Sequence, residues 1–246
     1  MLIQTEAVIL RSLPYRETSR IATLFTRSKG KLSVIAKGAR LPKSKFGSTL
    51  QALSVVQAVI YYRPTRSLQT LSECAHISMV RLEDLSRLSA GLRMVELTNA
   101  LMQEEEENPE VYDLLVSVLS RLNGTHTSAA LLQLYYEMQL ASALGFAPGF
   151  DREEVRTLPA KGGALLYDSG LIVADAEGQR YAKRASRPAL RTFAILSRAR
   201  LEVVAALTPR NVDEVRQLVA QYLRFHVAEA YPERARKILH QLQGSA

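Results

Sequence analysis

A dense group of cations lies in the first fifth of the chain, and its residue types suit one recognisable chemistry. Six Lys and Arg side chains fall between residues 29 and 45, and no acidic residue interrupts them. Phosphate backbones favour such a cluster, because each neutralised phosphate releases a condensed counterion. A solvated surface loop can show the same run of lysines, but its density favours phosphate contact from Lys29, Lys31, Lys37, Arg40, Lys43 and Lys45.

Aromatic side chains near these cations could hold the bases of a single strand, which stack on ring faces. Phe46 lies inside the basic loop and is included in the candidate site, with a core position as the equal alternative. Tyr15, Tyr61 and Tyr62 stand at the ends of expected strands. Phe25 and one member of the Tyr61–Tyr62 pair are expected in the core instead.

The net charge of +8 is unevenly distributed along the 246 residues. Residues 1–78 carry +9, residues 79–150 carry −6, and residues 151–246 carry +5. Such asymmetry indicates a polyanion-binding module joined to another part.

The elements that must position these cations are β-strands. Runs of strand length, rich in β-branched and aromatic residues and separated by Pro or Gly breaks, predict strands at Ala7–Ser12, Arg20–Arg27, Lys31–Ala39, Leu53–Tyr62 and Leu68–Ile77. Gly30 can supply the positive φ of a hairpin between the second and third runs. Five strands in this length suit a closed barrel, and the OB-fold is the five-stranded barrel that binds nucleic acids.

Alternation along the third run predicts which side of the barrel is basic. Leu32, Val34 and Ala36 share one face, and the opposite face carries Lys31, Ser33, Ile35 and Lys37. Lys37 and Arg40, which follows in the loop, are the preferred single contacts to phosphate.

Beyond residue 78 the apolar residues recur every three or four positions, which predicts helices. Asn108-Pro109 should begin a helix over residues 109–122, residues 128–144 should form a central helix that ends at Gly145, and Asn211 with Glu214 should form a capping box before residues 212–227. A last short helix is expected after Pro232. The predicted class is α+β, with an OB-fold barrel over residues 1–78 and a helical domain over residues 79–246 that carries a small β or irregular insert at about 149–186.

No catalytic constellation accompanies these elements. The sequence has no phosphate-binding Gly-rich loop before Lys-Ser or Lys-Thr, no GxGxxG and no GxSxG. The four histidines are scattered, and the single cysteine, Cys74, lies in an expected strand. We therefore expect a binding protein without catalytic residues or cofactor. Arg81, Arg87 and Arg93 are weak candidates for partner binding, with a solvated helix face as the favoured alternative.

Several blocks resemble one known family, the RecO proteins of recombination and DNA repair. The resemblance runs from Ala7-Val8-Ile9-Leu10-Arg11 through the block from Tyr15 to Ile21 and is most specific in Ala36-Lys37-Gly38-Ala39-Arg40 with Lys43-Ser44-Lys45-Phe46-Gly47. It continues in Leu144-Gly145-Phe146-Ala147-Pro148 and in Tyr222-Leu223-Arg224-Phe225-His226.

This resemblance implies an N-terminal OB-fold and a helical domain with a zinc-binding insert. It also implies binding of single- and double-stranded DNA, annealing of complementary strands, and work with RecR to load RecA onto DNA coated with single-strand-binding protein (SSB), whose acidic C-terminal tail would dock on the helical domain. The phosphate-contacting cations of the family fall here on Lys37, Arg40, Lys43 and Lys45.

The chain departs from the family at the zinc ligands. Glu153 and Arg156 stand where many members carry the first Cys-x-x-Cys, and Leu166 and Ser169 stand where they carry the second. Leu and Arg cannot bind zinc. We therefore expect an insert held by packing, with no structural metal.

The leading interpretation is a non-enzymatic, cytoplasmic DNA-repair and recombination mediator. No signal peptide or membrane segment is expected, because the N-terminal apolar run has only four residues, Ala7–Leu10. An RNA-binding protein of translation or RNA metabolism is the alternative, since OB barrels also bind single-stranded RNA.

Overall fold

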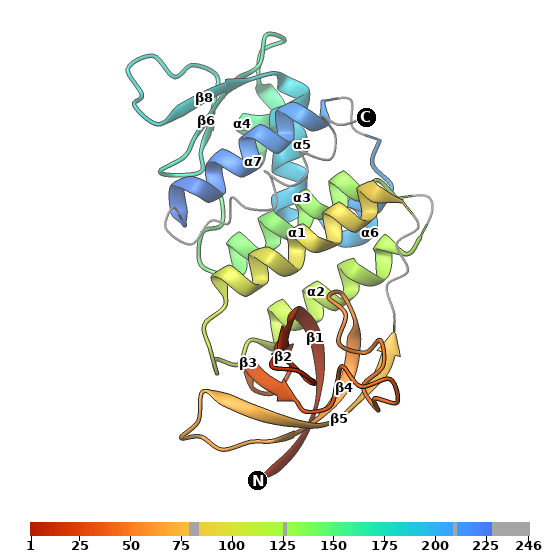
Figure 1. The fold of residues 1–246 in the computed structure, drawn as a ribbon. Coiled ribbons are helices and arrows are strands. Elements are labelled where there is room, and N and C mark those ends of the chain that lie inside the picture. Colours follow the sequence, from red (N-terminus) through yellow and green to blue (C-terminus); the bar gives the residue numbers. More distant parts are fainter. Residues whose placement is uncertain (79–83, 125–126, 209–210, 228–246) are drawn as a thin grey trace. The chain divides into compact units, whose positions relative to one another are not determined.

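The structure, a computed structural model, describes residues 1–78, 84–124, 127–208 and 211–227. These residues form two compact units: a barrel unit, Met1–Asn123, and a helical unit, Gly124–Tyr231 (Figure 1). The boundary predicted between residues 78 and 79 marks the change from strands to helices. In the structure, the first two helices belong to the same compact unit as the barrel. The predicted division into domains of residues 1–78 and 79–246 stays a prediction.

The barrel unit contains five strands and two helices. They are β1 (Leu2–Tyr15), β2 (Ser19–Thr26), β3 (Gly30–Ala36), β4 (Val55–Tyr61), β5 (Leu68–Ser78), α1 (Leu85–Leu101) and α2 (Pro109–Leu122). The strands close in the order β1-β2-β3-β5-β4, which confirms the five-stranded OB-type barrel. A bulge between Ile9 and Arg11 lets the long β1 pair with β4 through its first half and with β2 through its second half.

Alternation along β3 is as the sequence predicts. The side chains of Gly30–Ala36 are buried and half-buried in turn, with Leu32, Val34 and Ala36 in the barrel core. A second buried layer lies outside the barrel, where Val8 pairs with Phe25 and both are fully buried. The Phe25 ring lies 6.1 Å from that of Tyr112 on α2. This apolar contact explains why α2 belongs to the barrel unit.

The helical unit contains α3 (Ala129–Ala143), α4 (Arg152–Thr157), β6 (Gly163–Leu166), β7 (Ile172–Val173), β8 (Ala182–Ala185), α5 (Arg187–Arg198), α6 (Leu201–Ala205) and α7 (Val212–His226). As predicted, α3 is buried on most sides, and it packs against α5, α6 and α7. The strands form a small sheet in the order β7-β6-β8. The third strand and α4 were not predicted, and the expected helix after Pro232 lies outside the described residues.

The predicted starts of three helices are confirmed, at Pro109, Ala129 and Val212, but one predicted cap is not. Asn108 and Ser128 cap α2 and α3 through their side chains, and Gly145, at φ 88°, follows α3. The capping box of Asn211 and Glu214 is wrong, because α7 begins without a side-chain cap. The Glu214 carboxylate instead accepts from the backbone N–H and the hydroxyl of Ser186, 2.7 and 2.5 Å away, and so joins the start of α5 to α7.

The two family-like elements of the helical unit contact each other. The Tyr222 hydroxyl donates to the Phe146 carbonyl at 3.0 Å, and the Phe146 and His226 rings lie 5.1 Å apart. The Tyr222 and His226 rings meet edge to face at 4.5 Å. The resemblance at residues 144–148 and 222–226 therefore maps onto one packed aromatic cluster.

This cluster predicts a pH-dependent stability. Burial lowers the pKa of His226 below its ordinary value, although a backbone hydrogen bond at Tyr167 and the charge of Asp168 oppose the shift. The unfolded chain therefore binds more protons near His226 than the folded chain, and stability is lost as the pH falls through the pKa of the folded state. Thermal unfolding between about pH 8 and about pH 5.5 should show a falling midpoint that His226→Gln makes shallower. His76→Gln, at an exposed histidine of the barrel unit, is the control and should leave the slope unchanged.

Candidate nucleic-acid interface

The six predicted cations divide into two groups according to what they touch. Lys29 pairs with Glu107 at 2.5 Å, and this hydrogen bond raises the pKa of the Lys29 ammonium group. The Lys31 ammonium group donates to the carbonyl of Asn99, 2.9 Å away, in the last turn of α1. Lys29 and Lys31 thus already bind anionic or carbonyl oxygen within the protein, and their contact with phosphate stays a prediction.

The acidic segment, Glu104–Glu107, follows α1 and contacts the Lys29 side chain and the Lys31 backbone. Glu105 donates its backbone N–H to the Lys31 carbonyl at 3.0 Å and accepts from the Tyr62 hydroxyl at 3.1 Å. A Cβ on Gly30, at φ 60°, would lie 1.9 Å from the Glu106 carbonyl oxygen, so only glycine allows this approach. The backbone of the acidic run therefore packs against the start of β3, while its four glutamate side chains stay exposed.

The remaining four cations lie on the basic loop, residues 37–48, which connects β3 towards β4. Lys37, Arg40, Lys43 and Lys45 are all exposed. Arg40 fixes the loop, since its guanidinium group donates to the Arg16 carbonyl at 2.8 Å and its backbone N–H donates to the Thr18 carbonyl at 2.9 Å. In the part of the chain that the structure describes, Lys37 and Lys43 have no intramolecular polar partner.

Phe46 corrects one prediction, because it is a core residue and not a stacking platform. Only 2% of it is exposed, and it belongs to the apolar cluster inside the barrel. A base therefore has no access to its ring. The buried Phe46 ring anchors the basic loop. The ammonium group of the neighbouring Lys45 lies 5.6 Å from the centroid of this ring. Phe25 and Tyr62 are buried and Tyr61 is exposed, as predicted.

The outer surface of the strands supplies the apolar part of the interface. Consecutive strand pairings place one side chain from each strand, and two from β1, in a row that we call the outer rung: Leu13, Ile21, Ile35, Thr70, Tyr61 and Leu2. Each of them is exposed or half-buried. The outer face of strands 2 and 3 is the surface through which OB-folds bind oligonucleotides.

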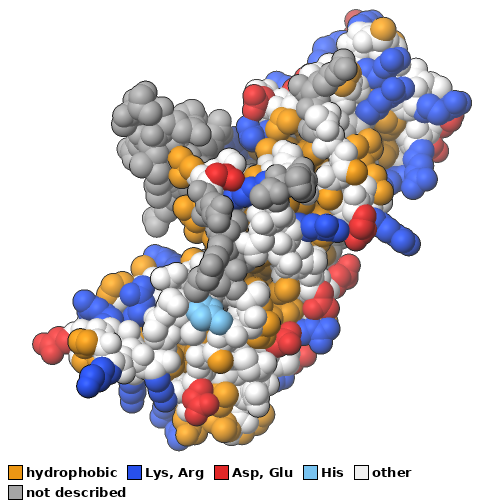
Figure 2. All heavy atoms as spheres, turned by 90° about the vertical axis from the view of Figure 1, so that its right-hand side faces the viewer, with side chains coloured by type: hydrophobic (Ala, Val, Ile, Leu, Met, Phe, Trp, Pro, Cys, Tyr) orange, Lys and Arg blue, Asp and Glu red, His pale blue; other side chains and the backbone are white. Residues whose placement is uncertain are grey.

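Arg11 and Arg16 belong to this surface and were missed by sequence reasoning. Arg11 is exposed on β1 opposite Thr23, directly beside the outer rung. Arg16 is exposed in the β1–β2 turn at φ 51°, and its guanidinium group lies 5.3 Å from the centroid of the Tyr15 ring. The pairing of Tyr15 with Ser19 closes this turn, and the Arg16 carbonyl accepts from Arg40, a long-range contact that no local pattern indicates. Figure 2 shows Lys and Arg side chains, in blue, around the barrel unit at the lower left.

Two family models match this chain. The family model of the recombination protein O N-terminal region matches residues 1–80, and that of its C-terminal region matches residues 82–235. The chain belongs to the RecO family. A DNA repair protein RecO of Salinibacter ruber is 47% identical over 99% of this chain and 95% of its own. Another, of Chlorobium phaeobacteroides, is 32% identical over 92% of this chain and 93% of its own.

The insert of this RecO-family chain does not fit the zinc ion that the resemblance implies. Glu153 and Arg156, at the positions of the first cysteine pair, form a bidentate ion pair with N–O distances of 2.9 and 2.6 Å. Leu166, at a position of the second pair, is buried on β6. Among the described residues, no three His, Cys, Asp or Glu side chains gather as metal ligands. Apolar packing holds the insert, and the Glu153–Arg156 pair lies exposed within α4.

The Gly162-Gly163 pair explains how the insert keeps its sheet. A Cβ on Gly162, at φ 93°, would lie 2.1 Å from the Ala185 carbonyl oxygen on β8. A Cβ on Gly163 would lie 2.2 Å from the Val173 carbonyl oxygen on β7. Both neighbouring strands thus approach β6 so closely that only glycine fits.

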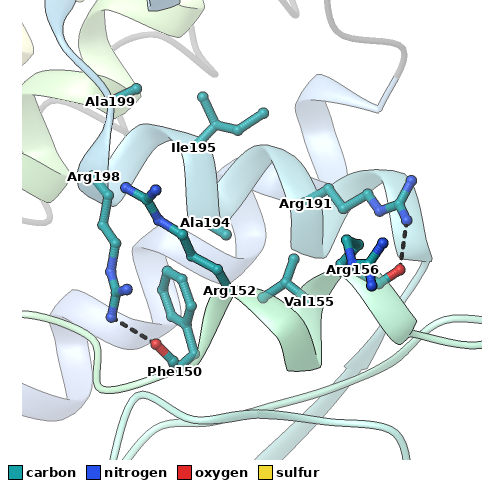
Figure 3. Close-up of a pocket in the computed structure, with 9 residues that line it drawn as sticks. All are labelled: Phe150, Arg152, Val155, Arg156, Arg191, Ala194, Ile195, Arg198 and Ala199. Atoms are coloured by element: carbon teal, nitrogen blue, oxygen red, sulfur yellow. Dashed lines mark hydrogen bonds between the residues drawn. The ribbon is translucent and has the colours of Figure 1, made fainter.

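Beside the insert lies an arginine pocket of about 460 Å³, between α4 and α5 (Figure 3). Its apolar wall contains Phe150, Val155, Ala194 and Ile195, and its cations are Arg152, Arg156, Arg191 and Arg198. Two of these arginines are fixed by backbone carbonyls: Arg198 donates to Phe150 at 2.6 Å and Arg191 donates to Arg156 at 2.9 Å. The Arg198 guanidinium group also lies 4.3 Å from the centroid of the Phe150 ring.

The three arginines predicted for partner binding do not line this pocket. Arg87 donates to the Leu122 carbonyl at 2.8 Å and pairs with Asp84, and its side chain is 14% exposed. Arg93 pairs with Glu96 at 3.3 Å, and its side chain is 12% exposed. Both therefore have partners within the barrel unit, and partner binding by them stays a prediction. Arg81 lies outside the described residues.

The composition of the insert predicts stability without metal. Incubation of the purified protein with a strong zinc chelator should leave the midpoint of thermal unfolding unchanged, because an ion pair and a buried leucine stand where thiolates would bind. Metal analysis of the same sample should give much less than one zinc per chain. Stoichiometric zinc, or a fall in the midpoint that added zinc reverses, would show that the insert uses other ligands.

Proposed function

We propose that the protein is a DNA-repair and recombination mediator that binds DNA, both single- and double-stranded, without catalysing a reaction. One observation carries this proposal: a basic loop with four exposed cations lies beside an exposed, partly apolar row on the outer face of an OB-type barrel. The relatives, which are named DNA repair protein RecO, support the same function. The proposed location is the cytoplasm, where the proposed target, chromosomal DNA, lies.

The binding mechanism follows from the charges. Lys37, Lys43 and Lys45 contact phosphates, while Arg40 contributes charge and also holds the loop against the β1–β2 turn. This binding is independent of base sequence, because the cations contact the backbone only. Neutralisation of two complementary strands on one surface lowers their repulsion and so permits annealing. Cooperation with RecR in loading RecA onto SSB-coated DNA is part of the same proposal.

The basic loop is tested by charge reversal. With about five phosphate contacts, the logarithm of the affinity for single-stranded DNA should fall with log salt at a slope of about −3.5, and Lys37→Glu with Arg40→Glu should flatten it by about 1.4. The matched control reverses two exposed cations of the helical unit, Lys161→Glu with Arg180→Glu. Equal affinity and slope in the loop variant and the wild type would refute the site. Poor competition by DNA against bound RNA would favour the RNA-binding alternative.

The helical unit supplies a docking site for a protein tail in this proposal. The acidic, Phe-ending C-terminal tail of SSB matches the arginine pocket, because the apolar wall can take the ring and four guanidinium groups can bind carboxylates. Glu153 is the nearby acid that already neutralises Arg156. Arg152, Arg191 and Arg198 are therefore the cations that matter most for the tail.

Arg152 offers the cleanest test of this docking, since it is exposed and makes no intramolecular polar contact among the described residues. Arg152→Glu should weaken binding of an acidic peptide with a free C-terminal Phe about ten-fold or more, because a charge-assisted hydrogen bond is replaced by repulsion. Fluorescence anisotropy of a labelled peptide measures this loss. Lys161→Glu makes the same reversal of charge at an exposed site that does not line the pocket, and the tail proposal fails if both variants weaken peptide binding equally.

A further inference from the structure

A cavity of about 370 Å³ lies on the barrel unit at the loop between β4 and β5, distinct from the basic loop. Its walls include Leu2, Tyr61, Arg63, Arg66, Gln69 and Thr70. None of the residues that line it is acidic. The cavity therefore combines an aromatic ring and two guanidinium groups, and its own lining contributes no carboxylate to compete for them.

The two arginines stand on a backbone that is fixed before any ligand arrives. Gln69 is 1% exposed, and its side-chain carbonyl accepts from the Arg63 N–H at 2.8 Å. Its amide group donates to the carbonyls of Arg63, at 3.0 Å, and of Arg66, at 2.5 Å. This buried glutamine satisfies the polar groups of the tight loop and so holds both arginine backbones in place. The two guanidinium groups have no polar partner among the described residues.

Tyr61 has an exposed ring on which a base can stack, whereas the ring of Phe46 is buried. Tyr61 is 55% exposed at the end of β4, beside the exposed Leu2 on β1. An exposed tyrosine beside cations is the composition of a base-stacking site, because every base has a π-face and its phosphate needs a counter-charge.

The outer rung connects this cavity to the proposed DNA surface. Ile35 on β3 pairs with Thr70 on β5, which in turn pairs with Tyr61 on β4. Tyr61 thus lies two strand spacings, roughly 10 Å, from Ile35 along one outward-facing row. A single strand that leaves the basic loop across β3 and β5 reaches the Tyr61 ring within a few nucleotides.

We propose that this cavity holds one nucleotide of single-stranded DNA, with its base stacked on Tyr61 and its phosphate bound by Arg63 and Arg66. The inference rests on the proposed function and extends its footprint from the basic loop to the β4–β5 loop. It also assigns a role to two cations of the barrel unit that lie outside the basic loop.

The test is a length series of labelled oligothymidylates, from about 4 to about 16 nucleotides, the range of site sizes for one OB-fold. Affinity for the longer oligonucleotides should fall about five-fold or more in Tyr61→Ala, because a stacked base is lost, while the shortest oligonucleotides bind the basic loop as in the wild type. Tyr61→Phe should restore binding, since it keeps the ring. Arg63→Ala with Arg66→Ala should show the same length-dependent loss and a shallower salt slope.

Two controls separate this inference from the proposed function. Tyr181→Ala removes an exposed tyrosine of the helical unit and should change nothing. If Tyr61→Ala binds every length as the wild type does while the variant with Lys37→Glu and Arg40→Glu loses affinity, the cavity is not a nucleotide site and the proposed function stands. If the basic-loop variant also binds normally, the proposed function itself fails.

A second measurement does not depend on variant folding. Photocrosslinking of the wild-type protein to oligothymidylate that carries iododeoxyuridine at one position should attach Tyr61 in the longer oligonucleotides. Crosslinks that map only to the basic loop, for every position of the reactive base, would overturn the inference.

Discussion

The contact between the acidic segment and the start of β3 decides which charges of the barrel remain for DNA. The Lys29–Glu107 pair neutralises one cation of the basic surface, the bond to the end of α1 engages Lys31, and the Glu105–Tyr62 bond holds the acidic segment in place. Each is a partly exposed interaction, and such contacts contribute little stability individually. Their larger consequence is placement, because they leave the free cations of the surface on the basic loop, the β1–β2 turn, the β4–β5 loop and the outer strand face.

This arrangement explains why much of the site could be predicted from sequence and why the rest could not. The alternation of Leu32, Val34 and Ala36 is a local pattern, so it predicted the core face of β3 correctly. The pairing of Lys29 with Glu107 joins residues far apart in the chain, and no local pattern carries it. Phe46 fails for the same reason: its burial depends on a loop that folds back over the barrel core.

In the helical unit, too, a long-range contact overrides a local sequence pattern, here at a single helix cap. Asn211 and Glu214 have the correct spacing for a capping box, but Ser186 offers Glu214 two donors from another helix. A tertiary hydrogen bond to a charged group outweighs a local cap of similar strength, because it also ties two elements together. The departure at the zinc positions was readable from the residues themselves, whereas the Glu153–Arg156 pair depends on α4, a helix that the sequence pattern did not predict.

The proposed annealing depends on which cations of the barrel surface are already paired within the protein and which are exposed. A mediator that pairs two strands must hold each of them and then release the duplex, so tight and specific base contacts would oppose its function. In the proposed mechanism, backbone neutralisation by lysines such as Lys37 and Lys43 gives binding that weakens steeply with salt and ignores sequence. The proposed stacking on the exposed Tyr61 ring adds contact to a single strand, and the base loses that contact when it pairs within a duplex. Together these proposed contacts would favour the unpaired strands over the product, which is the preference that release of the annealed duplex requires.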